Sequence, residues 1–195
     1  LNLAVGGING GPIDEEVLPM KYEIDYVRVY QKKDEIASGE IWEDNNGRHI
    51  NAHGGGVLFH EGRYYWFGEH RPAKGFSTEV GVTCYSSPDL CNWTYEGVAL
   101  PVSSEEGNDI EKGCIMERPK VIYNAKTGKF VMWFHLELKG EGYAAARAAV
   151  AVSDTPAGPY RFVRSCRVNP GVYPQNMTKA ERKAKLDTKD YKTWW

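Results

Sequence analysis

The sequence has 195 residues, of which 42% are hydrophobic, a composition that describes one or two globular domains rather than a disordered chain. Its 24 Lys and Arg residues nearly balance 26 Asp and Glu residues, and the formal net charge of −2 provides no global field for nucleic acid or an acidic membrane surface. No apolar run approaches the ~20 residues of a membrane-spanning helix, so we expect no membrane span.

The amino-acid composition and the two ends of the chain further restrict the class of protein. Aromatic residues make up 12% of the chain and glycine contributes 21 residues, a combination that favours an all-β protein. The four cysteines form no CxxC pair, which argues against zinc-ribbon and thioredoxin-type folds and leaves their redox state open. The chain starts without Met and ends on Trp194 and Trp195, large aromatic residues that a domain would normally bury, so we expect a fragment.

Residues 1–31 contain two β-type segments separated by a glycine-rich turn and an acidic loop. Two strands cannot form a stable domain alone. Residues 32–39 are polar and poor in aromatic residues, which is typical of an interdomain linker. A second module is therefore predicted to begin near Glu40.

This second module contains an internal repeat. Residues 62–67 match residues 128–133, an offset of 66, and the turn and aromatic strand at 87–95 match residues 153–162. Each unit predicts four antiparallel strands, which is the blade of a β-propeller. The alternative is two hairpin pairs of an ordinary β-sandwich. Because a propeller needs at least four blades and the repeat occurs twice, residues 40–195 are predicted to be the N-terminal part of a propeller.

A short surface helix is predicted near the C-terminal end. Thr178 and Glu181 form a capping-box pattern that is followed by good helix formers. We interpret the lysine-rich face of this segment as solvated rather than as a polyanion site.

Polar residues gather where each predicted blade begins and where its aromatic strand ends. Residues 49–56 read His-Ile-Asn-Ala-His-Gly-Gly-Gly, and the glycines predict a close approach to the backbone by either a ligand or a neighbouring strand. The innermost strands of propeller blades line a central channel, so side chains at these positions are expected to meet on one face. The candidate substrate-binding residues are His53, Gly54, Glu69, His70, Glu117, Arg118 and His135, with Trp66 or Trp133 for packing or stacking.

Carboxylates gathered with His and Trp side chains suit the hydrolysis of a glycosidic bond, which needs an acid, a base and donors for sugar hydroxyls. The simpler alternative is a surface ion pair between the neighbours Glu117 and Arg118. His49 and His53 have a spacing that fits a metal pair only on a helix, and three glycines follow directly. We therefore expect neither a metal nor a cofactor.

Three motifs together carry a family resemblance. Residues 49–56, the strand Tyr-Tyr-Trp-Phe-Gly-Glu-His over 64–70 and the Glu-Arg-Pro-Lys motif over 117–120 resemble the start of the β-1,3-galactanase-like branch of glycoside hydrolase family 43. The resemblance covers about residues 40–195 and implies two blades of a five-bladed propeller that hydrolyses carbohydrate with inversion. Residues 1–31 resemble the last strands of a glycoside hydrolase family 16 domain of laminarinase type, which implies a concanavalin-like β-sandwich.

The same resemblance implies that the catalytic residues are incomplete. Most family 43 members carry a catalytic-base Asp about ten residues before the Tyr-Tyr pair, where this sequence has Gly54. In the galactanase branch the replacement comes from a later blade. The acid and the residue that tunes its pKa would lie beyond Trp195, and the family 16 catalytic pair would lie before Leu1.

The predicted function is therefore that of a fragment, inactive alone, of a secreted, periplasmic or cell-envelope glycosidase. Its parent would be an inverting exo-β-1,3-galactanase or β-galactosidase-like enzyme acting on plant polysaccharide. Its partners would be an oligo- or polysaccharide with β-galactan side chains and the missing blades of the same polypeptide, with no nucleic acid. The alternatives are a non-catalytic carbohydrate-binding module and an inactive gene remnant.

Overall fold

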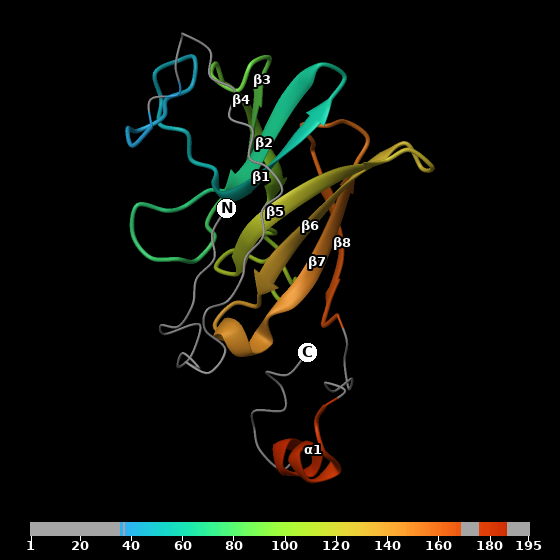
Figure 1. Ribbon diagram of the computed structural model, residues 1–195. Coiled ribbons are helices and arrows are strands. Elements are labelled where there is room, and N and C mark those ends of the chain that lie inside the picture. The colour runs from blue at the N-terminus through green and yellow to red at the C-terminus, as the bar shows by residue number, and fades with distance from the viewer. Residues whose placement is uncertain (1–35, 37, 169–175, 187–195) are drawn as a thin grey trace, which may run out of the picture. The chain divides into compact units, whose positions relative to one another are not determined.

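A computed structural model, shown in Figure 1, describes residues 36, 38–168 and 176–186. The sandwich strands predicted in residues 1–31, and most of the predicted linker, lie outside the described residues and stay predictions. Over the described ranges, no helix is both long and apolar enough to cross a membrane.

Two four-stranded antiparallel sheets make up most of the described structure, and in each one strands that follow in sequence lie side by side (Figure 1). The first sheet comprises β1 His53–His60, β2 Arg63–Glu69, β3 Gly81–Ser87 and β4 Thr94–Pro101. The second comprises β5 Ile115–Asn124, β6 Lys129–Glu137, β7 Arg147–Ser153 and β8 Arg161–Cys166. A 3-10 helix, η2 Gly142–Ala145, precedes β7, and an α-helix, α1 Lys179–Leu186, comes last.

The predicted repeat is confirmed as two equivalent four-stranded sheets. β6 begins 66 positions after β2, and β7 begins 66 positions after β3. The pairing repeats as well, because Phe67 lies opposite Cys84 and Trp133 lies opposite Val150. Alternate residues of a strand face opposite sides of a sheet, so residues related by this offset lie on equivalent faces.

The main hydrophobic core contains residues of both sheets. Phe67 of β2, Met116 of β5 and Phe134 of β6 belong to it, and none is more than 3% exposed. Cys84 and Cys114 lie in the same core as free thiols. Full burial of an apolar side chain of this size stabilises the fold by about 1.5–3 kcal/mol. This core therefore holds the two sheets against each other.

An aromatic cluster covers the other side of the first sheet. Trp66 packs edge-on against Trp42 and Trp93, with ring centroids 5.8 and 5.2 Å apart. The N–H of Ile50 donates a hydrogen bond to the Trp42 carbonyl at 2.8 Å, which keeps the segment before β1 against this side of the sheet. Of the two roles considered for Trp66, packing within the fold is the one observed.

The side of the second sheet that corresponds to the core side of the first sheet is open. Phe67 is 1% exposed, whereas Trp133, 66 positions later, is 47% exposed. On the first strands, Leu58 packs against the core, while its counterpart Ile122 is 56% exposed. A group of large exposed apolar side chains on one face is typical of an interaction surface.

Helix α1 begins as the capping box predicts. The Thr178 hydroxyl accepts a hydrogen bond from the N–H of Glu181 at 3.2 Å, and the Glu181 carboxylate accepts one from the N–H of Thr178 at 2.7 Å. Two backbone groups that a helix start would leave unpaired are thereby satisfied.

Candidate functional site

Each sheet has a β-bulge at the same place in its first strand. The register of β1 against β2 shifts between His53 and Gly56, and the register of β5 against β6 shifts between Glu117 and Lys120. Counted along the strands, Glu117 therefore occupies in the second sheet the position that His53 has in the first. Bulges are frequent next to functional sites because they redirect a side chain.

A histidine and a glutamate face each other at each bulge, but the strands that carry them are interchanged between the two sheets. His53 lies opposite Glu69 on β2, and Glu117 lies opposite His135 on β6. Each sheet thus presents one imidazole and one carboxylate at this end, with their strands interchanged. The candidate residues of the two repeats consequently occupy corresponding positions.

The second residue of each bulge has a left-handed backbone. Gly54 adopts a φ of 57° and Arg118, its counterpart, adopts a φ of 53°. Glycine takes this conformation freely, whereas a residue with a side chain is strained by about 1–3 kcal/mol there. Strain of this kind at Arg118 is characteristic of functional sites, where the surrounding structure holds a side chain in one direction.

The carboxylates of Glu69 and Glu117 come from different sheets and meet at one guanidinium. Arg71 Nη2 lies 2.9 Å from Glu69 Oε1 and 3.3 Å from Glu117 Oε1. The other oxygen of Glu117 accepts a hydrogen bond from Arg118 Nη2 at 2.6 Å. The structure therefore brings together the predicted residues Glu69, Glu117 and Arg118. The ion pair between the sequence neighbours Glu117 and Arg118 is one part of a larger network.

Glu69 is the most deeply buried carboxylate of this network. The side chain of Glu69 is 5% exposed, whereas the side chain of Glu117 is 20% exposed. Burial raises the pKa of Glu69 above its ordinary value, the charge of Arg71 opposes this shift, and the charge of Glu117 adds to it. The ionisation of Glu69 therefore depends on the balance between its two charged neighbours.

Arg71 was absent from the sequence-based candidates, and its place is set by Asn51. The Asn51 side chain accepts a hydrogen bond from the N–H of Arg71 and donates one to its carbonyl, both at 2.8 Å. Strand β3 holds Asn51 in turn, because the Asn51 N–H donates to the Tyr85 hydroxyl at 3.1 Å and its carbonyl accepts from the Thr83 hydroxyl at 2.6 Å. The only sequence signal was position, since Asn51 lies in the His-Gly motif and Arg71 directly follows the Gly-Glu-His motif.

The glycines at the start of β1 are explained largely by close packing. A Cβ on Gly55 would lie 2.0 Å from the Phe67 carbonyl oxygen, and one on Gly56 would lie 2.6 Å from the Lys120 side chain. The Lys120 ammonium also donates a hydrogen bond to the Gly55 carbonyl. Neighbouring strands, one in the same sheet and one in the other, therefore occupy the space at these two glycines. Gly54 instead needs its freedom for the left-handed backbone.

Two predicted histidines stand next to the carboxylates. His53 is exposed, and partial desolvation followed by the charge of Arg71 lowers its pKa, which favours the neutral imidazole. His70 Nδ1 is buried without a hydrogen-bond partner, although the His70 N–H donates to the Gly81 carbonyl at 2.9 Å. In the part of the chain that the structure describes, no group of three or more His, Cys, Asp or Glu residues is placed to hold a metal ion.

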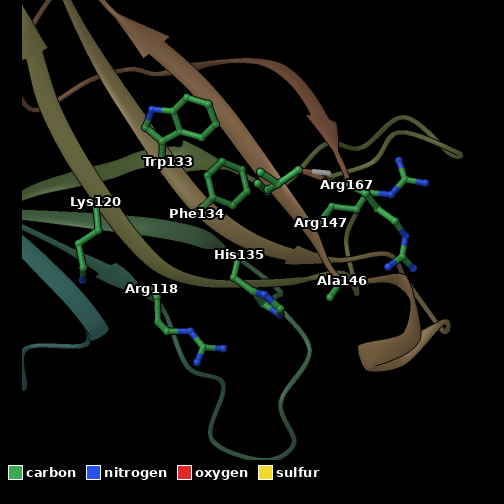
Figure 2. A pocket seen from close by; sticks show the side chains of 10 residues that line it. Arg118, Lys120, Trp133, Phe134, His135, Ala146, Arg147 and Arg167 are labelled. Atoms are coloured by element: carbon green, nitrogen blue, oxygen red, sulfur yellow. The ribbon is translucent and has the colours of Figure 1, made fainter. Parts of the chain in front are cut away.

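His135 belongs to a pocket on the second sheet rather than to the carboxylate pair. Its Nε2 lies 3.1 Å from Glu137 Oε1, and its ring packs against Tyr143 with centroids 5.4 Å apart. The pocket has a volume of about 520 Å³. Figure 2 shows Arg118 and His135 on the same side of it, so the pocket adjoins the carboxylate network through Arg118. Other lining residues include Lys120, Trp133, Arg147 and Arg167.

Comparison with known proteins identifies similar solved structures, while no family model and no curated protein matches. A β-1,3-galactosidase of glycoside hydrolase family 43, solved with galactodeoxynojirimycin, is 75% identical over 82% of this chain and 46% of its own length, with a TM-score of 0.71. The exo-β-1,3-galactanase of Clostridium thermocellum is 47% identical over 68% of this chain and 27% of its own, with a TM-score of 0.61. The exo-β-1,3-galactanase of Phanerochaete chrysosporium, solved with galactose, is 39% identical over 68% of this chain and 30% of its own, with a TM-score of 0.62.

The chain spans less than half the length of each of these three proteins. Their names give no support to the family 16 resemblance of residues 1–31, which remains a prediction from sequence. For the part of the chain that they cover, the similarity supports the family that the sequence motifs imply, glycoside hydrolase family 43.

Proposed function

We propose that this chain is part of an inverting family 43 hydrolase that removes β-1,3-linked galactose from a plant polysaccharide. The observation that carries the proposal is the meeting of Glu69 and Glu117 at Arg71, where two sheets adjoin. Similarity to enzymes named β-1,3-galactosidase and exo-β-1,3-galactanase supports galactose as the sugar. Inversion rests on the family resemblance alone.

Glu69 and Glu117 are assigned to substrate contact. Each lies beside an arginine that donates to one of its oxygens, and a carboxylate oxygen accepts hydrogen bonds. Sugar hydroxyls are suitable donors for both. The other assigned contact residues are His53, Gly54, His70 and Arg118 around the carboxylates and His135 in the adjoining pocket.

The same geometry argues against these two carboxylates as the acid and base of an inverting reaction. Their oxygens lie 2.9 and 3.3 Å from one nitrogen, so these oxygens cannot be farther apart than the sum of those distances. That is less than the roughly 6.5–9.5 Å that an inverting pair needs to admit water. We therefore propose that the chain alone binds the sugar without hydrolysing it, and that the parent protein supplies the acid and base.

The remaining parts of the proposal concern the parent protein. We propose that the two sheets are the first blades of a five-bladed propeller, preceded by the last strands of a family 16-like sandwich. The exposed Trp133 and Ile122, on a face whose counterpart in the first sheet is buried, support a third blade. A polysaccharide substrate too large to cross a membrane supports a secreted or cell-envelope location.

Calorimetric titration of the 195-residue chain with galactodeoxynojirimycin tests the proposed sugar site. We expect binding, with the gluco-configured analogue at least about tenfold weaker because a wrongly placed hydroxyl loses its hydrogen bond. Glu117→Gln should weaken binding. Glu111→Gln is the matched control, since the Glu111 side chain is 19% exposed, against 20% for Glu117, and pairs with Lys139 instead.

A properly folded chain that binds neither sugar analogue would refute the sugar site. In parallel, β-1,3-galactotriose should remain intact when incubated with the chain alone. Release of galactose by the purified chain would contradict the assignment of substrate contact without catalysis.

A further inference from the structure

Arg71 is held from several directions although it lies just beyond the end of β2. Both of its backbone polar groups are bonded to the Asn51 side chain. Its guanidinium carbon lies 5.3 Å from the centre of the Phe76 ring, a cation–π distance. A surface arginine would sample several rotamers, whereas these contacts keep this guanidinium in one place.

The guanidinium also connects the two sheets. Its Nη2 reaches Glu69 at the end of β2 and Glu117 in the bulge of β5, residues that belong to different hydrogen-bonded sheets. Glu117 Oε2 is bonded separately to Arg118, so Oε1 is directed to Arg71. Without Arg71, two carboxylates would face each other in a partly buried site, and Arg118 would remain as a cation that acts on Glu69.

We propose that Arg71 is a positioning residue that holds the carboxyl groups of Glu69 and Glu117 together, as hydrogen-bond acceptors, across the junction of the two sheets. The inference rests on the proposed function in one respect, that these two carboxylates contact the sugar. Arg71 itself is assigned no contact with the substrate.

Charge balance around Glu69 gives this role a measurable consequence. The charged groups that act on Glu69 are Arg71 and Arg118, which favour its ionised form, and Glu117, which disfavours it. Burial also disfavours the ionised form and is the largest influence. Removing Arg71 and removing Glu117 should therefore move the pKa of Glu69 in opposite directions.

One donor of Arg71 is left over. Its Nη1 is buried and has no hydrogen-bond partner, and the same is true of Nδ1 of the preceding His70. Buried polar atoms are nearly always paired in folded proteins, so an unpaired Nη1 indicates that the placement of this guanidinium is not set by its own hydrogen bonds alone. This fits an arginine placed to serve the two carboxylates rather than to maximise its own hydrogen bonds.

The test is a pH titration of the Glu69 side-chain carboxyl carbon by NMR in the 195-residue chain, with the resonance assigned from Glu69→Gln. The midpoint is expected to rise in Arg71→Gln, to fall in Glu117→Gln and to lie between the wild type and Arg71→Gln in Arg71→Lys. Lysine keeps the charge but replaces the rigid, planar guanidinium with a compact ammonium on a flexible stem, so it should hold the two carboxylates less firmly. Arg63→Gln is the control, because Arg63 is a half-buried arginine of β2 that hydrogen-bonds to Ser86 instead.

Ligand affinity supplies a second readout. Arg71→Gln should weaken the binding of galactodeoxynojirimycin at least about tenfold, while Arg63→Gln should leave it within about twofold. An unchanged Glu69 midpoint in Arg71→Gln would overturn the proposal. If that variant does not fold, Arg71→Lys and Glu117→Gln decide, and unchanged midpoints in both would overturn it.

These outcomes separate the inference from the proposed function. The titration needs no sugar, so midpoints that move as expected in a chain that binds no galactose analogue would support the role of Arg71 and refute the sugar site. Sugar binding together with an unchanged Glu69 midpoint would support the sugar site and refute the role of Arg71.

Discussion

Replacing Phe67 and Trp133 by alanine, one at a time, compares two residues that occupy the same position in the repeat. Phe67 is 1% exposed in the core between the sheets, and Trp133 is 47% exposed on the open face of the second sheet. Deleting a fully buried phenylalanine side chain costs about 3–5 kcal/mol. Deleting a side chain that is half in water should cost about 1 kcal/mol or less, because little apolar area returns to solvent and no cavity forms.

Urea unfolding followed by far-UV circular dichroism measures both costs without relying on tryptophan fluorescence. In thermal unfolding of a chain of this size, the same free-energy costs would lower Tm by about 6–20 °C for Phe67→Ala and by about 4 °C or less for Trp133→Ala. Equal losses in the two variants would show that the face carrying Trp133 is covered in solution. That result would refute the description of the second sheet as lacking a partner on this face.

Three further predictions concern other parts of the chain. Gly55→Ala should destabilise the fold more than Gly62→Ala in the same urea assay. A Cβ on Gly55 meets the Phe67 carbonyl oxygen at 2.0 Å, whereas one on Gly62 meets nothing within 4 Å, so Gly62→Ala costs only the backbone strain of its φ of 80°. Equal losses would contradict the close packing of β1 against β2. The raised pKa of Glu69 means that the folded state binds its proton more tightly than the unfolded state, so this residue's contribution to stability is present below its ordinary pKa of 4.5 and is lost as pH rises through the raised pKa. Glu69→Gln should remove this part of the pH dependence of unfolding, and an unchanged profile would argue against the shift. Thr178→Ala should weaken α1 by about 0.5–2 kcal/mol and lower the helical Cα chemical shifts over that segment, whereas unaltered shifts would show that the capping hydroxyl has no role.

The two halves of the candidate site were predictable to different degrees. Glu69 and Glu117 could be proposed from sequence because both end up at recognisable places in a repeated strand pattern. Their common partner could not, because Arg71 is separated from Asn51 by 20 positions and from Glu117 by 46. Strand periodicity and turn chemistry describe neighbours along the chain, and they contain no record of which distant side chain a guanidinium will reach.

For His135 and the glycines as well, the sequence predicted the position but not the contacts. The repeat placed His135 correctly at the end of an aromatic strand, yet its hydrogen bond goes to Glu137, two positions along its own strand. The glycine run signalled a close approach, and only the packed structure identified what approaches, the Phe67 carbonyl at Gly55 and the Lys120 side chain at Gly56.

The sequence by itself determined the four-stranded repeat, the offset of 66 between the sheets and the capped start of α1. All of these follow from alternation, turn residues and caps, which act over a few residues. The tertiary structure alone decided that Arg71 joins Glu69 to Glu117, that Trp66 packs while Trp133 is open, and that Arg118 takes the strained bulge position of Gly54. Those features depend on how two sheets pack against each other, because charge pairing and burial are properties of neighbours in space.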